Sequence, residues 1–225
     1  LVRLKPDSTL VIRPYGNVVE QYTTTPLSRA IEEATSQDRS ETRLRDMLEA
    51  IHRAAGDDDI TQMVIDPNFM WNIGLAALND LGHALDAFRS TGKPVIALAD
   101  HLNQNQYFMA ALADEIWLNP NGSILIDGFS SYRQFYREGL EKLEVEINLF
   151  RVGKYKSAME PFIRDDMSDE AKEAGRFWLN NLWQQYIETV AKNRGLIVQT
   201  LQESVDDLPN RIEAVDGDFA AYALD

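Results

Sequence analysis

Apolar residues along the first half of the chain follow two alternating patterns. Met63-Val64-Ile65 and the run from Pro94 to Ala99 are short continuous apolar segments, typical of strands buried on both faces. Apolar side chains recur with helical spacing in two further segments. One is a helix expected over 41–55, with Leu44, Met47, Leu48 and Ile51 on one face, and the other has Leu75, Leu78, Leu81, Leu85 and Phe88. Short buried strands that alternate with amphipathic helices predict an α/β fold with mostly parallel strands.

The remaining elements have weaker patterns. In chain order we expect a strand over 10–15, a loop over 21–37, a helix over 104–113, strands over 115–118 and 123–126, a helix over 132–140 and a strand over 145–152. The segment Asn119-Pro120-Asn121-Gly122 between the two short strands has turn chemistry. These assignments continue the order of strands and helices seen in the first half.

A long helix is expected over about 168–195. Ser168 is a good N-cap, and Asp169 and Glu170 favour the first turn of a helix. Large apolar residues spread over more than one face of this helix, at Phe177, Trp178, Leu182, Trp183 and Tyr186. They indicate either ordinary core or a surface used for assembly. No linker rich in Pro, Gly and Ser divides the chain, so we expect one domain over residues 1–225 with a helical C-terminal extension.

Composition narrows the possible functions. The 225 residues include 22 Lys and Arg and 36 Asp and Glu, which gives a net charge of −14. Nucleic-acid affinity depends on basic residues that neutralise phosphates, so we expect no nucleic-acid partner. The hydrophobic share of 44% is enough for a packed core and excludes intrinsic disorder. The absence of cysteine excludes disulfides, a thiolate metal site and a cysteine nucleophile.

Signals for metals and nucleotides are missing. His52, His83 and His101 are scattered and form no recognised ligand spacing, although His101 follows a strand end, where α/β folds place their sites. The sequence has neither a glycine-rich phosphate loop nor the Gly-x-Ser-x-Gly turn of α/β-hydrolases. We therefore expect no metal and no cofactor.

The segment from Phe150 to Phe162 is the most unusual in the chain. It places Lys154 and Lys156 two residues apart in an acidic protein, at the end of an expected strand. A basic surface loop is one interpretation, and a general-base lysine is the other. A lysine is almost fully protonated at pH 7, so a lysine base needs desolvation, which Tyr155, Met159 and Phe162 could provide. Strand alternation does not choose between Lys154 and Lys156.

A resemblance to a known family does choose between them. The string Gly153-x-Tyr155-Lys156-Ser157-Ala158-x-Glu160-Pro161-Phe162, continued through 163–168, resembles the lysine motif of the long bacterial signal peptide peptidase A family, also called protease IV. The likeness extends to 90–95, 103–107, 116–120 and 218–224, and so covers almost the whole chain. It implies a Clp protease/crotonase-like fold, a spiral of β-β-α units.

The resemblance also implies roles for individual residues. Long members of the family use a Ser-Lys dyad divided between two related halves, and this chain resembles the N-terminal, lysine-bearing half. Lys156 is then the general base, Ser157 and Tyr155 are candidate neighbours of that base, and Lys154 is an exposed variable position. The catalytic half carries Ser-Gly-Gly-Tyr where this chain has Gln104-Asn105-Gln106-Tyr107, so Gln104 occupies a degenerate nucleophile position.

The oxyanion hole departs from the family pattern as well. The catalytic half has a Pro-Gly-Gly turn where this chain has Asp66-Pro67-Asn68-Phe69-Met70-Trp71. The implied function is a membrane-associated serine endopeptidase that degrades cleaved signal peptides. Its serine comes from a C-terminal half outside this chain, so we expect the fragment alone to be inactive.

The implied setting is a homotetramer on the periplasmic side of the bacterial inner membrane, held by an N-terminal anchor that precedes Leu1. Two alternatives stay open. One is a non-catalytic crotonase-fold scaffold for oligomerisation and substrate capture, with Lys156 as a buried structural cation. The other is an acyl-CoA hydratase or isomerase, which would need an oxyanion hole and an acidic base.

Overall fold

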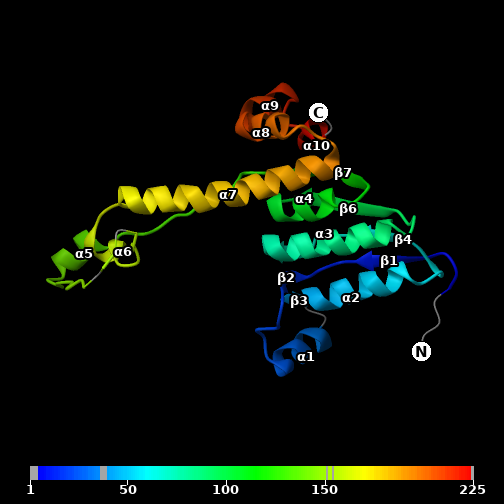
Figure 1. Cartoon of the computed structure of the whole chain (residues 1–225), viewed down its shortest axis with the longest axis horizontal. Helices are drawn as coiled ribbons and strands as arrows, with labels where there is room; N and C mark the ends of the chain where they lie inside the picture. Colours follow the sequence, from blue (N-terminus) through cyan, green and yellow to red (C-terminus); the bar gives the residue numbers. More distant parts are fainter. Residues whose placement is uncertain (1–4, 36–39, 151, 154, 224–225) are drawn as a thin grey trace. The chain divides into compact units, whose positions relative to one another are not determined.

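Two parallel sheets organise the strands (Figure 1). The computed structural model describes residues 5–35, 40–150, 152–153 and 155–223. Among these residues, one sheet has the order β1-β4-β6-β7, with β1 (Ser8–Ile12), β4 (Ile60–Ile65), β6 (Val95–Leu102) and β7 (Glu115–Ile124). The other has the order β3-β2-β5, with β3 (Glu41–Arg43), β2 (Gly16–Val19) and β5 (Met70–Asn72).

The chain contributes strands to both sheets before each of the two long helices of its first half. β1 joins the first sheet and β2 joins the second, and α2 (Leu44–Ala55) follows after an insertion that contains a short helix and β3. The unit then repeats, because β4 joins the first sheet, β5 joins the second, and α3 (Leu75–Arg89) follows. This repeated β-β-α order confirms the predicted α/β fold of the Clp protease/crotonase type.

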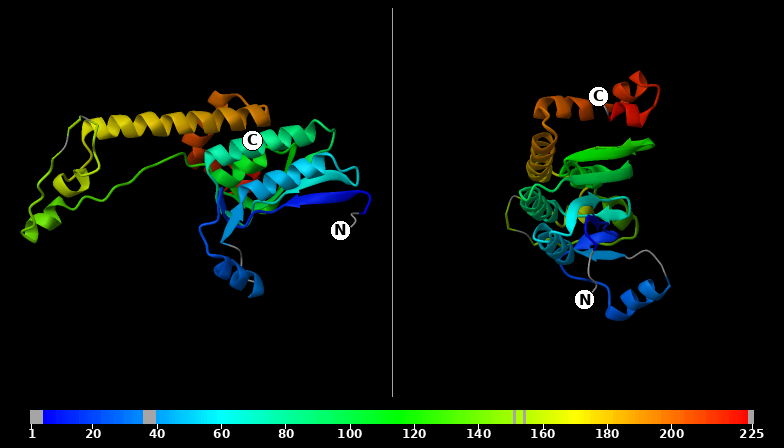
Figure 2. Two further views of the ribbon diagram at one scale, coloured as in Figure 1. Left: turned by 60° about the horizontal axis from the view of Figure 1, so that its bottom comes forward. Right: turned by 90° about the vertical axis from the view of Figure 1, so that its right-hand side faces the viewer.

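The helices bury the apolar stripes that the sequence predicts. Leu44, Met47 and Ile51 are buried on α2, and the apolar positions of α3 are buried at Leu78, Leu81, Leu85 and Phe88. The two helices lie side by side along one face of the four-stranded sheet (Figure 2). On the sheet, Met63, Ile65, Val95 and Ala97 are fully buried, as expected for parallel strands covered by helices.

The expected loop over 21–37 is wrong, because α1 (Pro26–Ala34) lies within it. The helix begins with Pro at its first position, and the Thr25 hydroxyl accepts a hydrogen bond from the Ser28 amide. Leu27 and Ile31 are exposed, so this helix lacks the buried apolar stripe by which helices are found from sequence. The expected helix over 41–55 is also shorter at its start, since residues 41–43 form β3.

The two strands expected over 115–118 and 123–126 form one strand, β7. Leu118 pairs with Ala99 and Ser123 pairs with His101, so the four residues between them form an irregularity in a continuous ladder. The Asn121 amide donates to the Asn119 side chain at 2.9 Å. A Cβ on Gly122 would lie 2.2 Å from the carbonyl oxygen of Asp100, so glycine is required there. Residues 119–122 therefore form an irregularity within β7, and they do not end the strand as the sequence predicted.

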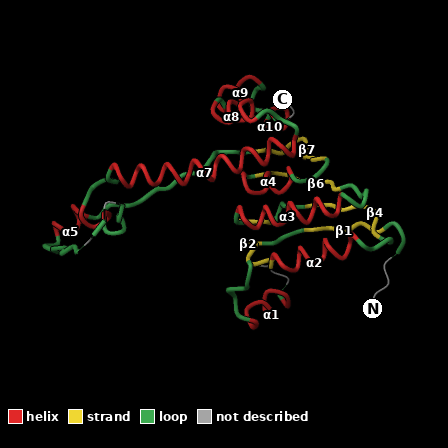
Figure 3. The backbone as a smooth tube through the Cα atoms, viewed as in Figure 1, coloured by secondary structure: helices red, strands yellow, loops and turns green. Residues whose placement is uncertain are grey.

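The chain divides into two compact units: unit 1 comprises Leu1–Asp127 and Ile187–Asp225, and unit 2 comprises Gly128–Tyr186. The single domain expected over 1–225 stays a prediction. Unit 2 contains α5 (Arg137–Lys142), α6 (Glu160–Ile163) and the first part of α7 (Asp169–Arg194). The expected long helix is confirmed by α7, which ends just before Gly195 (Figure 3).

Two expectations within unit 2 are wrong. Residues 132–136 are irregular, and the helix begins only at Arg137. No strand forms over 145–150 or at Val152, the described part of the expected strand. Its apolar side chains are exposed or half-buried, with Phe150 96% exposed, and no pairing of this segment with a strand is found in the described part of unit 2. Alternating sequence without a pairing partner does not make a strand.

The last described elements of unit 1 are three short helices: α8 (Val198–Asp206), α9 (Leu208–Ala214) and α10 (Phe219–Tyr222). Together with α7 they confirm the helical C-terminal extension. The remaining helix of unit 1, α4 (Gln104–Ala111), follows β6 directly. Within the described part of the chain, the helices lack any stretch long and apolar enough to span a membrane.

Candidate functional site

Lys156 lies in an exposed irregular segment of unit 2, four residues before α6. Gly153 allows the chain to fold back beside the lysine side chain, because its φ of +115° is a conformation that other residues rarely adopt. A Cβ at Gly153 would lie 3.7 Å from Cγ, Cδ and Cε of Lys156. The glycine of the motif therefore permits the turn, and the lysine stem lies close to it.

The two residues expected beside the base have their own partners. The Ser157 hydroxyl accepts a hydrogen bond from Arg133 at 3.4 Å, and the Tyr155 hydroxyl donates to Glu173 of α7 at 3.3 Å. Both contacts tie the lysine segment to other parts of unit 2. The roles of Ser157 and Tyr155 as partners of Lys156 stay predictions, and Lys154 lies outside the described residues.

The apolar side chains around Lys156 do not enclose it. Tyr155, Met159 and Phe162 are all exposed, as is Lys156 itself. The interpretation of Lys156 as a buried structural cation is therefore wrong for this chain.

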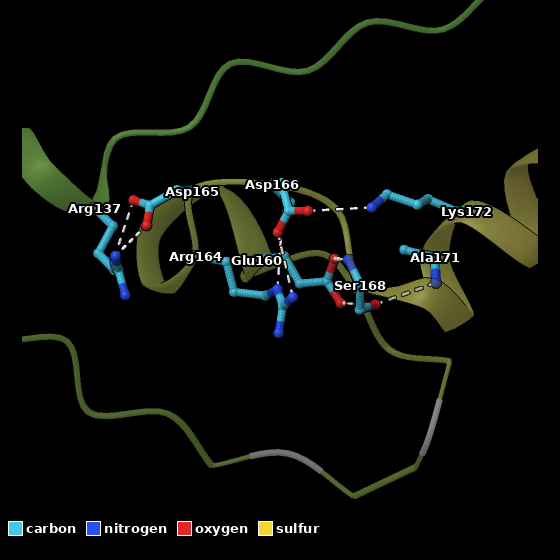
Figure 4. Close-up of polar contacts among 8 residues, drawn as sticks. All are labelled: Arg137, Glu160, Arg164, Asp165, Asp166, Ser168, Ala171 and Lys172. Carbon is cyan, nitrogen blue, oxygen red and sulfur yellow. Dashed lines mark hydrogen bonds and ion pairs between the residues drawn. The ribbon is translucent and has the colours of Figure 1, made fainter.

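Glu160 is the buried residue of this otherwise exposed or half-buried region, with 2% of its surface exposed. Its carboxylate accepts hydrogen bonds from the Ser168 amide at 3.1 Å and from the Ser168 hydroxyl at 2.5 Å (Figure 4). The same hydroxyl accepts a hydrogen bond from the Ala171 amide at 3.2 Å. This contact confirms the prediction that Ser168 is the N-cap of α7. The sequence motif contains Glu160, but its contact with Ser168 was not expected.

Ion pairs surround this contact on the exposed side of the segment. Arg137 pairs with Asp165, and Asp166 accepts from both Arg164 and Lys172 (Figure 4). The hydrogen bond from Lys172 is the largest cause that lowers the pKa of Asp166 below its usual value. These pairs connect α5, the end of α6 and the first turns of α7 within unit 2.

Gln104 lies in unit 1 as the first residue of α4, and its side chain is buried, with 8% exposed. A carboxamide has no hydroxyl or thiol that a base could activate for attack on a carbonyl. The Asn103 side chain accepts from the amides of Asn105 and Gln106, and the Gln106 side chain accepts from the Asn103 amide. The segment where the resemblance places the degenerate nucleophile position is thus a capping box that begins a helix.

The segment 66–71, where the resemblance places an oxyanion hole in the catalytic half, is held by side chains of unit 1. The amide group of Gln106 donates to the carbonyl oxygens of Pro67 at 3.1 Å and Met70 at 2.8 Å. The Asn68 amide donates to the Asp66 carboxylate, and the Met70 amide donates to the Pro67 carbonyl. These two amide donors are therefore already engaged and do not point at a substrate oxygen.

A cavity of about 850 Å³ in unit 1 was not predicted. Tyr107, Trp117, Arg194, Ser204 and Tyr222 are among its lining residues, and burial raises the pKa of Tyr107. Its serine, Ser204, donates to the Thr200 carbonyl of its own helix. Among the described lining residues there is no lysine or histidine.

The structure thus places the predicted site residues in two groups. Tyr155, Lys156 and Ser157 belong to unit 2, and Gln104 with the segment 66–71 belongs to unit 1. In the described part of the chain, no group of three or more His, Asp or Glu lies close enough together to hold a metal ion.

Comparison with known proteins identifies the family. The profile of Peptidase family S49 matches residues 87–209, which is more than half of the chain and includes the whole lysine segment. The chain belongs to family S49. This confirms the resemblance on which the assignment of Lys156 depends.

Relatives with known names are also similar to this S49 chain, and they are proteases. It is 41% identical over 199 residues to Protease 4 of Salmonella typhi, a match that covers 88% of this chain and 32% of that protein. It is 41% identical over 178 residues to Protease 4 of Haemophilus influenzae, covering 79% and 29%. A chloroplastic serine protease SPPA of Arabidopsis thaliana is 24% identical over 108 residues, covering 48% and 16%. The chain spans about a third of the length of the two bacterial relatives.

Solved structures similar to this S49 chain include an enoyl-CoA hydratase/isomerase family protein from Silicibacter pomeroyi, at 18% identity, 88% and 91% coverage and a TM-score of 0.33. An enoyl-CoA hydratase from Shewanella pealeana matches at 14% identity, 75% and 77% coverage and a TM-score of 0.30. Scores this low carry no argument about function. The fold assignment rests on the repeated β-β-α order of the chain itself.

Proposed function

We propose that this chain supplies the general base, Lys156, of a serine peptidase whose nucleophilic serine lies outside residues 1–225. The observation that carries the proposal is the lysine segment 153–162, which lies inside the part of the chain matched to family S49. Lys156 is exposed on unit 2, where a second protein surface can approach it. Gln104 cannot attack a carbonyl, so the nucleophile has to come from elsewhere.

The chemistry requires Lys156 to be unprotonated when the substrate binds. Its amine then removes the proton of the serine hydroxyl as the serine oxygen attacks the peptide carbonyl. The resulting ammonium returns the proton to the leaving amine, and an acyl-enzyme remains. The same amine next removes a proton from water, which hydrolyses the ester and regenerates the serine. Every proton that Lys156 takes is returned within the cycle.

Cleaved signal peptides are the proposed substrates, since they are extended and apolar. The exposed side chains of Tyr155, Met159 and Phe162 support this, because they offer apolar contacts close to the lysine. We place the activity on the periplasmic side of the bacterial inner membrane, with an N-terminal anchor outside this chain. Phe177 and Trp178, which are exposed on α7, support assembly into a homotetramer. Trp183 and Tyr186 instead stack on one another in unit 2, at 5.3 Å between ring centroids.

Replacement of Lys156 in the full-length protein tests the proposal. We expect Lys156→Met to lower hydrolysis of a fluorogenic signal-peptide-like substrate by at least about 100-fold, the usual contribution of a general base. Lys142→Met is the matched control, because Lys142 is an exposed lysine of unit 2 at the end of α5. Circular dichroism checks that each variant folds. Activity in folded Lys156→Met equal to that of wild type would refute the proposal.

A second candidate is a non-catalytic scaffold that captures substrate and supports oligomerisation. The buried amide of Gln104 and the engagement of segment 66–71 by Gln106 favour it, because both replace reactive groups with structural contacts. The same experiment separates the two candidates. A scaffold role predicts that Lys156→Met keeps full activity in the assembled protein.

A further inference from the structure

We infer that Glu160 is a positioning residue for Lys156: its buried carboxylate fixes the lysine segment to the N-terminus of α7. The inference rests on the proposed function, in which Lys156 is the base. It concerns how the base is held relative to a substrate bound by the assembled protein.

Burial shows that Glu160 is held inside unit 2. Its side chain is 2% exposed, although the residues around it, 155–159 and 161–168, are exposed or half-buried. A buried carboxylate is costly unless it accepts hydrogen bonds. Two bonds come from Ser168, one to each carboxylate oxygen. The positive end of the α7 dipole also favours a negative charge at this point.

Ser168 is itself held in place by hydrogen bonds to the first turn of α7. Its hydroxyl donates to Glu160 and accepts from the Ala171 amide, while its carbonyl accepts from the Lys172 amide at 2.9 Å. A side chain that caps a helix in this way has little rotational freedom. Glu160 is therefore attached to the start of a 26-residue helix and not to another irregular segment.

The backbone carries this restraint to Lys156. The Glu160 amide donates to the Ser157 carbonyl at 3.1 Å, and Ser157 directly follows Lys156. The Arg164 amide donates to the Glu160 carbonyl at 2.9 Å, so the residue is held on both sides. At the other end, Gly153 lies against the lysine stem. Loss of the Glu160 contact would release the turn that positions the base, and a shift of about 1 Å in such a group can cost about 100-fold in rate.

The test is steady-state kinetics of the full-length protein on a fluorogenic signal-peptide-like substrate. Glu160→Gln replaces one acceptor oxygen by an amino group, which cannot accept from Ser168. We expect kcat to fall by about 10- to 100-fold with KM within about twofold of wild type, measured well below the unfolding temperature. Glu146→Gln is the matched control, because this carboxylate is exposed in an irregular segment of unit 2 away from α6 and α7 in the sequence, and we expect its kcat to match wild type.

Ser168 variants separate positioning from general stability. Ser168→Ala removes the same contact from the other side, so the double variant Glu160→Gln/Ser168→Ala should be no slower than Glu160→Gln alone. Ser168→Thr keeps a hydroxyl and should retain most of the activity. If Glu160→Gln fails to fold, the comparison of Ser168→Ala with Ser168→Thr decides the question.

The outcomes distinguish this inference from the proposed function. A loss of kcat in Glu160→Gln and Ser168→Ala, together with loss of activity in Lys156→Met, supports both. Unchanged kcat in the Glu160 and Ser168 variants, with or without a lower unfolding temperature, overturns the positioning role while an inactive Lys156→Met leaves the base assignment intact. Full activity in Lys156→Met overturns the proposed function and the inference with it.

Discussion

The side-chain amide of Gln106 donates to the carbonyl oxygen of Met70 at 2.8 Å, which joins the first turn of α4 to the first residue of β5. The residues are 36 positions apart in sequence, and Gln106 is buried. The same side-chain amide also donates to the carbonyl oxygen of Pro67, and the side-chain carbonyl oxygen of Gln106 accepts from the backbone amide of Asn103. One side chain therefore both caps a helix and closes the segment 66–71.

Removal of this side chain should destabilise unit 1. Gln106→Ala removes the Gln106 donor from the Met70 carbonyl and one of two donors from the Pro67 carbonyl, which still accepts from the Met70 amide. We expect a loss of about 1–3 kcal/mol in the free energy of unfolding. Urea unfolding followed by circular dichroism measures it. Gln199→Ala, on the exposed face of α8, is the control and should change stability by less than about 0.5 kcal/mol. An equal, small effect of both variants would mean that the Gln106 contacts contribute nothing.

Glu41 gives unit 1 an acid-dependent contribution to stability. Its carboxylate accepts from the hydroxyl and amide groups of Thr23 and Thr24, and the side-chain bond from Thr23 is the largest cause that lowers its pKa below the usual value of 4.5. Because the folded pKa is the lower one, the contribution is fully present above pH 4.5 and is lost as the pH falls through the folded value.

Glu41→Gln should therefore be less stable than wild type at pH 7, and the difference should shrink as the pH falls below 4.5. Urea unfolding of both proteins at a series of pH values measures the difference. Glu49→Gln on the exposed surface of α2 serves as the comparison. A gap between Glu41→Gln and wild type that stays constant from pH 7 to pH 3 would contradict the assignment.

The parts of the fold that the sequence predicts are those that bury a regular apolar pattern. α3, β4 and β6 are found from Leu81, Met63 and Val95 and their neighbours because each lies in the core and its spacing follows the helix or the strand. β2, β3 and β5 have only three or four residues each, and their pairing depends on partners distant in sequence. Local pattern carries no signal for such strands.

The candidate site shows the same division. Lys156 is proposed from the resemblance of its motif, which also contains Gly153, whereas the positive φ of Gly153 is known only from the structure. The contact between Glu160 and Ser168 joins residues that are separated by eight positions and an irregular segment. No helical or strand period links them, so their proximity becomes apparent only in the folded chain.

Gly153 should be required for the position of Lys156. Gly153→Ala places a side chain at φ +115°, where such a residue is strained by about 1–3 kcal/mol, and 3.7 Å from the lysine stem. We expect kcat/KM of the full-length protein to fall by about 10- to 100-fold as the segment rearranges. Gly139→Ala in α5 is the matched control, since that glycine has no neighbour within 4 Å of a Cβ and no positive φ. Wild-type activity in Gly153→Ala would show that the base does not depend on this turn.

A serine placed at the degenerate nucleophile position should not create a peptidase. Gln104→Ser in the chain of residues 1–225 restores a hydroxyl at the start of α4, but the amides of Asn68 and Met70 still donate within the segment 66–71. Without donors for the oxyanion, the tetrahedral intermediate lacks a contribution that is worth about 100- to 1,000-fold in kcat for each donor.

We expect no hydrolysis of a fluorogenic peptide by this variant above the background of the unmodified chain, measured over hours at high protein concentration. Labelling with a fluorophosphonate, which reacts with activated serines, provides a second measurement that does not depend on turnover. The unmodified chain and Ser204→Ala, which removes the cavity serine of α8, are the controls for labelling at other sites. Labelling of Gln104→Ser at residue 104 would contradict this prediction. It would show that α4 and the segment 66–71 still activate a nucleophile, and that only Gln104 prevents a reactive serine at this position.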